Sequence, residues 1–478
     1  MASASDLRRA VAAPLAAALT AILAWFGTGL HPWWPLLWFA PLPVLVFAAG
    51  ASWWRAAIVA AIAWLGGAMG LWVGLHTVLP IPIAEFAQLA GSEAVAFLLG
   101  VLLYRALLRR GAYGWAVVAF PAVRVAFEYL LAISWPHGTF MSLAYTQVEL
   151  LPVLQLASVT GPWGITFLVL LVPAALAAAW QLRGARDRAL RIAGAATAAL
   201  AGVLVFGATR LTGDESGPQV QVGLVASDPP TSPHIAEEGA ATTALLDAYA
   251  RSAETLAAEG AQLIVLPEKL GVAVDPGTQD IDARFQALAD RTRAVIAVGL
   301  VHVAGASSYN EARTYTPSAP VQVYAKHHML LPFEPFEPGT ALSLLSQPPG
   351  TWGVQICKDM DFTPLSRDYG RAGAALMVVP AWDFRADGFL HSRMAVMRGV
   401  ESGFSVVRAA KRGNLTVSDD KGRILAETPS DAAPFSTLRA RAPAVHADTL
   451  YLRFGDWFAW LMLAALALAI AKLLRRRR

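Results

Sequence analysis

The sequence is poor in charge and almost without cysteine. Charged residues make up 15% of the 478 positions and hydrophobic residues 56%, whereas ordinary soluble domains are about a quarter charged. This composition argues against an ordinary soluble protein and predicts a membrane protein. The single cysteine, Cys357, excludes an intramolecular disulfide. No cluster of cysteine and histidine has the spacing of a metal site, so we expect no metal and no other cofactor.

Long apolar runs recur in the N-terminal part of the chain and once near its end. Eight stretches are apolar over roughly the 20 residues that a bilayer-crossing helix needs: residues 10–27, 33–50, 56–75, 88–108, 113–133, 160–181, 189–208 and 455–474. The first is read as a retained helix and not a signal peptide, because six more follow at short intervals. The expected domains are a membrane domain with seven transmembrane helices (1–212), a hydrophilic domain (217–440), and a C-terminal transmembrane helix with a basic tail (454–478).

Lysine and arginine are confined to alternate connections between these runs. They lie near the N-terminus, around 105–110 and 183–191, and in the C-terminal tail, whereas residues 76–87 and 129–180 contain none. Because short cytoplasmic loops collect positive charge, both termini are predicted in the cytoplasm and the hydrophilic domain outside it. The basic balance of the chain is therefore a topological signal, and we expect no nucleic acid partner.

The hydrophilic stretch has the pattern of an α/β domain. Short apolar runs of strand length alternate with polar or helical segments; the runs are 219–227, 263–267, 294–303, 352–356, 375–380, 404–410 and 414–419, and the helical patterns cover 238–260 and 280–293. Continuous apolar runs are typical of strands buried on both faces. We therefore expect sheets covered by helices or by a second sheet.

Three strand ends in this domain each carry one reactive residue. Glu268 follows one apolar run, Lys326 lies in VYAKHH, and Cys357 follows another run. A nucleophilic cysteine needs a base for its proton and a nearby cation, and these residue types supply both. A lone cysteine is more commonly a small buried hydrophobic side chain, and strand-end charges commonly face water, so no one of the three makes the case alone.

Together these residues resemble the nitrilase, or carbon–nitrogen hydrolase, superfamily, whose catalytic set is Glu, Lys and Cys in that chain order. The matching segments are Pro267-Glu268, the K-x-H-x-x-x-P-F motif from Lys326, and Ile356-Cys357. A later segment with Trp382, His391, Met394, Arg398, Glu401 and Arg408 is similar to the superfamily's fourth region. The resemblance implies a four-layer αββα sandwich.

The membrane part narrows the resemblance to the apolipoprotein N-acyltransferase family. Glu128, Tyr145, Gln147 and QLASVTGPWGITF (155–167) are similar to that family's signature. The resemblance implies a multi-pass protein of the bacterial inner membrane whose catalytic domain faces the periplasm. It also implies a membrane phospholipid as acyl donor and an apolipoprotein as acyl acceptor. The sequence predicts no oligomeric state.

The resemblance assigns roles to seven residues. Cys357 would hold the acyl group as a thioester, with Glu268 as general base, Lys326 stabilising the oxyanion and Glu334 as second carboxylate. Asp359, Trp382 and His391 would contact substrate.

Two local departures from the family keep alternatives open. Lys358 and Asp359 stand where an aromatic residue and a glutamate are usual, and PFEPFEP lacks a glycine, so that Glu337 competes with Glu334 for the second carboxylate role. A membrane-tethered amidase with the same catalytic set is one alternative function. A catalytically inactive, lipid-binding homologue is another.

Overall fold

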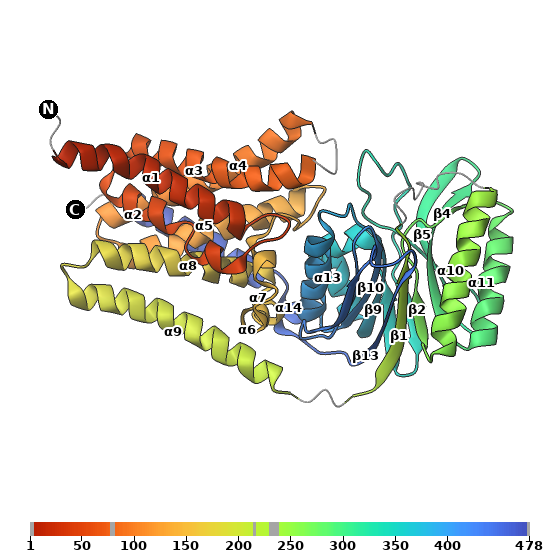
Figure 1. Ribbon diagram of the computed structural model, residues 1–478. Coiled ribbons are helices and arrows are strands. Elements are labelled where there is room, and N and C mark those ends of the chain that lie inside the picture. The colour runs from red at the N-terminus through yellow and green to blue at the C-terminus, as the bar shows by residue number, and fades with distance from the viewer. Residues whose placement is uncertain (1–3, 77–81, 214–216, 229–238, 476–478) are drawn as a thin grey trace. The chain divides into compact units, whose positions relative to one another are not determined.

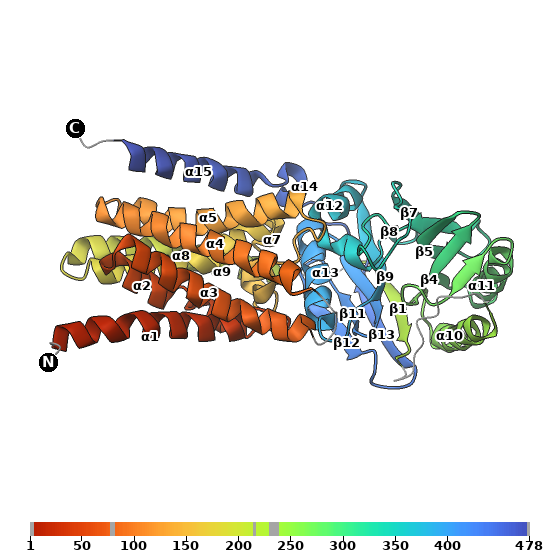
Figure 2. The same ribbon diagram turned by 90° about the horizontal axis from the view of Figure 1, so that it is seen from above.

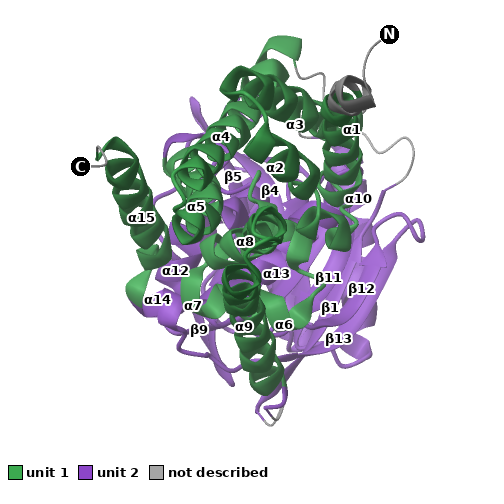
Figure 3. Cartoon of the chain, turned by 90° about the vertical axis from the view of Figure 1, so that its left-hand side faces the viewer, with its two compact units in different colours: residues 1–133, 141–211, 454–478 green, residues 134–140, 212–453 purple. Residues whose placement is uncertain are grey.

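The computed structural model describes residues 4–76, 82–213, 217–228 and 239–475. The chain forms two compact units, drawn in different colours in Figure 3. Unit 1 comprises residues 1–133, 141–211 and 454–478, and unit 2 comprises 134–140 and 212–453. The expected membrane domain included residues 134–140, but the structure assigns this segment to unit 2 because its contacts lie there.

Unit 1 is helical. Its described elements are α1 (Ala4–Gly27), η1 (Trp34–Trp38), α2 (Leu42–Gly50), α3 (Trp53–His76), α4 (Ile83–Arg109), α5 (Tyr113–Ser134), η2 (Leu143–Gln147), α6 (Leu151–Leu154), α7 (Ala157–Thr160), α8 (Pro162–Gln181), α9 (Arg186–Leu211) and α15 (Trp457–Leu474). Among the described residues, six helices are long and apolar enough to cross a membrane: α3, α4, α5, α8, α9 and α15. These six coincide with the last six expected spans.

The second expected span, residues 33–50, is not one helix. The chain forms the short η1, turns, and then begins α2. Pro35 and Pro43 occupy first-turn positions of these two elements, and Pro41 caps the second. Proline has no N–H to donate and disfavours a helix interior, and three prolines in nine residues, at the starts of two successive elements, divide this run. The first expected span lies on α1, whose apolar part, Val11–Gly27, is a shorter apolar helix.

The surface of unit 1 is apolar along its helices. On α3, Ile58, Ile62 and Val73 are each at least half exposed, as suits helices surrounded by lipid. Arg110, in the connection between α4 and α5, donates from Nη1 to the carbonyl oxygen of Arg475 at 3.3 Å. Two of the basic segments in the sequence therefore lie at the same end of unit 1.

Unit 2 contains two sheets. The strand orders are β13-β1-β2-β4-β5-β6, with β3 paired to β4, and β12-β11-β10-β9-β8-β7. The strands are β1 (Gln219–Ala226), β2 (Leu263–Val265), β3 (Val272–Val274), β4 (Val295–Ala304), β5 (Ser307–Tyr315), β6 (Gln322–Ala325), β7 (Ser343–Gln347), β8 (Gly350–Val354), β9 (Ala374–Trp382), β10 (Ser405–Lys411), β11 (Asn414–Ser418), β12 (Ile424–Pro429) and β13 (Ser436–Pro443). The helices are α10 (Ala240–Ala258), α11 (Thr278–Thr292), η3 (Cys357–Asp361), α12 (Thr363–Arg371), α13 (Gly388–Ser402) and α14 (Leu450–Phe454).

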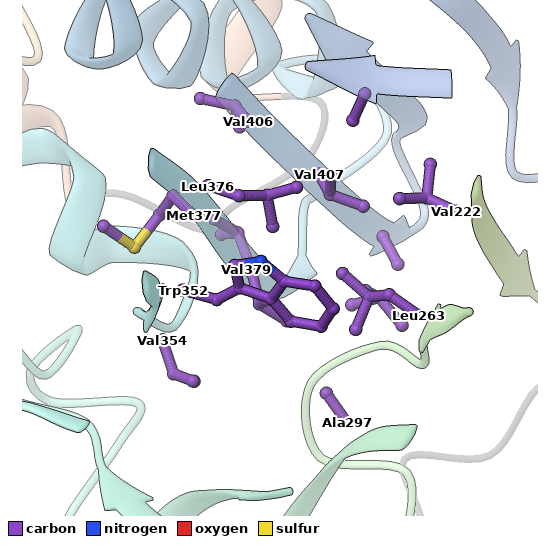
Figure 4. Close-up of a cluster of buried hydrophobic side chains, with 14 of the residues drawn as sticks. Val222, Leu263, Ala297, Trp352, Val354, Leu376, Met377, Val379, Val406 and Val407 are labelled. Atoms are coloured by element: carbon purple, nitrogen blue, oxygen red, sulfur yellow. The ribbon is translucent and has the colours of Figure 1, made fainter. Parts of the chain in front are cut away.

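The two sheets stack face to face with helices outside them. Figures 1 and 2 show α10 and α11 against the first sheet and α12 and α13 against the second. Apolar side chains from both sheets fill the space between them, including Val222, Leu263, Trp352, Leu376 and Val407 (Figure 4). A second cluster joins the first sheet to α10 and α11 through Leu246, Tyr249 and Phe285. Unit 2 is thus a four-layer αββα sandwich.

The structure confirms the expected strands and the two expected helices of unit 2 to within a few residues. Strands β5 and β6 and the hairpin of β7 and β8 were only partly anticipated. The strand β5, SSYNEARTY, is polar in sequence yet buried over its second half, because its partners β4 and β6 place it inside a sheet. Polarity alone therefore failed to indicate this strand, and β5 carries a residue of the site.

Candidate active site

Glu268, Lys326 and Glu334 form a buried ion cluster where β2 and β6 end. The Lys326 Nζ donates to Glu268 Oε1 at 2.9 Å and to Glu334 Oε2 at 2.7 Å. All three side chains are at most 4% exposed. Burial opposes the charge of Lys326, but the two glutamates outweigh it and hold its pKa well above the usual value. The lysine is therefore a permanent cation.

The approach of Glu268 to this cluster depends on Gly299 in β4. A Cβ atom at Gly299 would lie 2.4 Å from the carbonyl oxygen of Pro267 and 2.5 Å from the Cα of Glu268. Any other residue would push the segment that carries Glu268 away from the sheet. The backbone N–H of Glu268 donates to Ala381 of β9 at 3.3 Å, so the end of β2 is tied to the second sheet as well.

Two residues that the sequence did not suggest complete the cluster. Asn310 of β5 donates from Nδ2 to Glu268 Oε1 at 2.6 Å and to Glu334 Oε1 at 3.3 Å. Lys269 donates from Nζ to Glu334 Oε1 and lies 3.9 Å from Glu268. Although burial disfavours a charged Glu334, Lys326 and Lys269 hold the pKa of its carboxyl well below the usual range. Two lysines thus balance two carboxylates, as buried charges require.

The second carboxylate of the cluster is Glu334. Its Oε2 also accepts from the N–H of Leu330 at 2.9 Å, which ties it to its own loop. The competing residue, Glu337, accepts from Ser307 Oγ at 2.6 Å in an exposed contact. The two glutamates are three residues apart in one loop, so only the course of that loop separates their roles.

Cys357 begins the turn η3 directly after β8, in a strained backbone conformation. Its φ is +43°, a region that costs a non-glycine residue about 1–3 kcal/mol and is often stored at reactive positions. The sulfur lies 3.5 Å from the carbonyl oxygen of Trp382. Burial and then Glu268 raise the pKa of the thiol well above its usual value, against the opposing effect of Lys326. The resting thiol is neutral, so its attack on a substrate requires a base.

Asp359 is bonded entirely inside unit 2. Its Oδ1 accepts from the N–H of His328 at 2.9 Å and of His327 at 3.2 Å, and its Oδ2 accepts from Tyr324 at 2.7 Å. The side chain is fully buried. The sequence assigned Asp359 to substrate contact, but its oxygens connect the cysteine turn to the segment that follows Lys326.

Trp382, at the end of β9, lies among cations. The Nζ of Lys411 is 3.6 Å from its ring centroid and the Nζ of Lys269 is 4.8 Å away. Lys411 donates to the carbonyl oxygen of Lys269 at 2.8 Å. Burial and the neighbouring Lys269 lower the pKa of Lys411 to about 7. The ring therefore contacts the amino groups of two lysines beside the cluster.

His391 of α13 lies between two carboxylates. Its Nε2 is 3.3 Å from Asp387 Oδ2 and its Nδ1 is 3.7 Å from Asp361 Oδ1. Burial disfavours the imidazolium, but these carboxylates outweigh it and raise the pKa of His391 to about 10. The ring of Phe140 packs against it with centroids 5.6 Å apart. His391 is thus held as a cation by protein groups.

Two buried ion pairs support the elements behind the site. Arg408 of β10 donates from Nη1 to Asp383 Oδ2 at 2.9 Å, and Arg398 donates to Glu401 at 3.0 Å within α13. Each arginine is at most 1% exposed. These residues of the fourth motif hold the end of β9 and α13 in place. Over the residues that the structure describes, no group of three or more His, Cys, Asp or Glu side chains could hold a metal ion.

A half-buried thiol in the same unit as a buried Glu–Lys–Glu cluster, on an αββα sandwich, is the arrangement expected of a nitrilase-type domain. Residues 231–434 match the carbon–nitrogen hydrolase family. Residues 17–176 match the N-terminal domain of apolipoprotein N-acyltransferase. The chain belongs to the apolipoprotein N-acyltransferase family, with both of that family's parts in their expected order.

Two similar proteins carry the name of this family. The chain is 28% identical to an apolipoprotein N-acyltransferase of Geobacter metallireducens over 399 residues, 76% of this chain and 75% of the relative. It is 27% identical to one of Caulobacter vibrioides over 416 residues, 77% of this chain and 75% of the relative. A crystal structure of an amidase from Nesterenkonia sp. covers 51% of this chain and 96% of its own, at 20% identity and a TM-score of 0.42.

Proposed function

We propose that this protein transfers a fatty acyl group from a membrane phospholipid to the N-terminal amine of the diacylglyceryl-cysteine of apolipoproteins. The observation that carries the proposal is the neutral Cys357 thiol beside Glu268 and Lys326, in a chain that also has the helical domain of the N-acyltransferase family. Both substrates are lipids, which accounts for a catalytic unit joined to apolar helices.

In the first step Cys357 attacks the ester carbonyl carbon of the phospholipid. Glu268 takes the thiol proton as the C–S bond forms, and the ammonium of Lys326 stabilises the oxyanion. The C–O bond then breaks, and Glu268 returns the proton to the departing lysophospholipid oxygen. The acyl group remains as a thioester on Cys357.

In the second step the free amine of the acceptor attacks the thioester carbonyl. Glu268 takes the proton of the attacking amine, the C–S bond breaks, and the sulfur recovers a proton from Glu268. In both steps Glu334 holds Lys326 in position, and Asn310 holds Glu268 in position. Trp382 and His391 stay candidates for substrate contact. Asp359 positions the turn η3, which carries Cys357.

The test is a mass measurement on the purified full chain incubated with phospholipid vesicles. We expect a mass increase equal to one fatty acyl group, lost on treatment with hydroxylamine and absent in Cys357→Ala. Transfer to a diacylated lipopeptide with a free amine should then discharge the adduct. Turnover of short amides without a lipid adduct would replace the proposal with an amidase. A lack of either reaction in a folded protein that binds lipid would indicate an inactive homologue.

We also propose that the protein is a bacterial inner-membrane protein with unit 2 in the periplasm and both termini in the cytoplasm. The support is the distribution of basic residues and the contact between two basic segments, Arg110 and Arg475. In a Cys357→Ala background, Thr437→Cys on the exposed β13 should react with a membrane-impermeant maleimide in spheroplasts. Its matched control, Gly184→Cys in an exposed basic connection, should react only after permeabilisation. The opposite labelling would invert the topology.

A further inference from the structure

The segment Ser134–Phe140 follows α5 in the chain but packs on the turn that carries the nucleophile. The backbone N–H and the Oγ of Thr139 both donate to the carbonyl oxygen of Asp361, at 3.0 Å and 2.7 Å. Gly138 lies against the same atom and has a φ of +53°. A short segment from elsewhere in the chain therefore binds the last residue of η3.

The same segment contacts the residue that follows the nucleophile. The Nζ of Lys358 lies 3.1 Å from Nδ1 of His137 and 3.7 Å from Asp361 Oδ2. Burial lowers the pKa of Lys358, and the nearby Asp361 opposes this effect. When Lys358 is charged its ammonium only donates, so Nδ1 accepts and the imidazole proton lies on Nε2. Burial and then Lys358 lower the pKa of His137 to about 4. The imidazole is therefore neutral at physiological pH and can accept the hydrogen bond from Lys358.

The turn η3, which carries the strained Cys357, is thus held by hydrogen bonds on two sides. Asp359 joins it to the segment after Lys326, on one side. His137 and Thr139 hold Lys358 and Asp361 on the other. A non-glycine residue in a left-handed conformation persists only where the surroundings over-determine it. Without the second set of bonds, Cys357 at +43° is held by its neighbours in the sandwich alone.

We propose that residues 134–140 position the nucleophile, with His137 acting on Cys357 through Lys358. His137 and Lys358 are positioning residues and take no part in bond breaking. The proposal rests on the proposed function only in taking Cys357 as the nucleophile. It predicts that the reactivity of this one sulfur depends on a segment more than 200 positions earlier in the sequence.

The first experiment compares His137→Ala with His137→Asn in the full chain. The Asn side chain keeps an acceptor oxygen near the position of Nδ1, whereas Ala removes it. Because Cys357 is the only cysteine, its alkylation by iodoacetamide can be followed by intact mass without any lipid. We expect the alkylation rate constant to change by at least about threefold in His137→Ala, and acyl-adduct formation to slow about ten- to a hundredfold with little change in KM for the lipid. His137→Asn should recover most of both.

The outcomes separate this proposal from the proposed function. Parental alkylation and adduct rates in His137→Ala would overturn the positioning role. Equal losses in Ala and Asn, together with an equal fall in thermal stability, would overturn it in favour of a purely structural role. If the parent forms no adduct at all, the acyltransferase assignment fails, while the alkylation comparison still decides whether His137 positions the sulfur.

A second pair of variants tests the segment independently of His137. A Cβ at Gly138 would lie 2.6 Å from the carbonyl oxygen of Asp361, so Gly138→Ala must displace the segment or the turn. Gly305, between β4 and β5, also has a positive φ, +62°, but nothing lies within 4 Å of its added Cβ. Gly305→Ala carries a similar backbone penalty without the clash. We expect altered alkylation of Cys357 in Gly138→Ala only; a parental rate in both, or the same change in both, would overturn the proposal.

Discussion

Each unit of this protein contains a buried cluster in which one cation lies between two glutamates, and the two clusters differ in their other partners. In unit 2, Lys326 lies between Glu268 and Glu334. In unit 1, Arg124 of α5 pairs with Glu93 of α4 at 2.8 Å and with Glu128 at 2.8 Å. Composition and burial do not distinguish them.

The difference lies in what else the carboxylates bind. Glu128 accepts from Ser142 Oγ at 2.8 Å, from the N–H of Leu143 at 3.1 Å and from Thr166 Oγ1 at 2.9 Å. These bonds fix the start of η2 and its contact with α8. The cluster of unit 1 therefore ties chain segments together.

The carboxylates of unit 2 are bonded instead to side chains that can act on a neighbouring thiol. Glu268 accepts from Lys326 and Asn310, and together with burial, which is the larger cause, its charge raises the pKa of the Cys357 thiol. An ionisable residue among membrane helices is by default a hypothesis of function. The comparison shows that the hydrogen-bond partners of a buried charged side chain, and not its charge, indicate whether its role is catalytic or structural.

Removing the cation should break both clusters but stop chemistry in only one. Arg124→Met leaves two buried carboxylates without a counter-ion, whereas Lys326→Met leaves two that share only Lys269. Removing one partner of a buried ion pair typically costs about 3–5 kcal/mol. We expect no acyl adduct from Lys326→Met. Arg124→Met, at a temperature where it stays folded, should keep alkylation of Cys357 at the parental rate. Adduct formation at the parental rate in Lys326→Met would remove the lysine from the mechanism.

Replacing Glu268, Glu334 and Glu337 by Gln one at a time should show how much each contributes to the rate of adduct formation. Glu268→Gln removes the base and should slow adduct formation about 10²–10⁴-fold. Glu334→Gln should slow it less, because Lys326 keeps Glu268 as a partner. Glu337→Gln is the matched control in the same loop and should stay within about twofold of the parent, since this side chain is outside the cluster. A larger loss in Glu337→Gln than in Glu334→Gln would exchange the two assignments.

In unit 1 the same substitution should lower the stability of the protein more at Glu128 than at Glu93. Glu128 accepts hydrogen bonds from four residues including Arg124, whereas Glu93 accepts from Arg124 and, at 3.4 Å, from Trp64. An amide loses acceptor capacity at buried donors, so Glu128→Gln should be less stable than Glu93→Gln by about 1–3 kcal/mol. Unfolding of the protein in detergent would measure the difference. Equal losses would mean that the bonds of Glu128 to η2 and α8 contribute nothing.

The smallest expected effect is a pH dependence at His391. Its folded pKa of about 10 exceeds the value of about 6.5 expected in the unfolded chain. Because the folded state binds the proton more tightly, this contribution to stability is fully present below about pH 6.5 and is lost as the pH rises through about 10. His391→Gln should therefore unfold a few degrees below the parent at pH 6, and the gap should narrow toward pH 10. A gap that does not vary with pH would show that His391 is not held as a cation.

Local patterns predicted much of this protein. Apolar runs such as 263–267 and 294–303 indicated strands because burial on both faces requires continuous apolar sequence. The order of Glu268, Lys326 and Cys357 after strand-like runs indicated a site, although β2 and β6 belong to one sheet and β8 to the other. The break in the second expected span was also present locally, in its prolines, and the count of apolar residues concealed it.

Other features of the site have no local signature. Asn310 lies in a polar segment that becomes a buried strand only through its partners, and Lys269 gains its role from the position of Glu334. Glu334 and Glu337 have nearly identical sequence surroundings, PFEPFEP, and only the path of the loop separates them.

The amino-acid order by itself determined the apolar helices and the α/β character of the second unit, because both depend on composition or on short-range periodicity. It also led to the proposal of Cys357 as nucleophile, through the order of Glu268, Lys326 and Cys357 in the chain. The tertiary structure alone decided that Glu334 pairs with Lys326 and that Asp359 bonds to the backbone of His328. It also decided that residues 134–140 bind the turn that carries Cys357. Those outcomes depend on hydrogen bonds between groups far apart in the chain, and such bonds leave no periodic trace in the sequence.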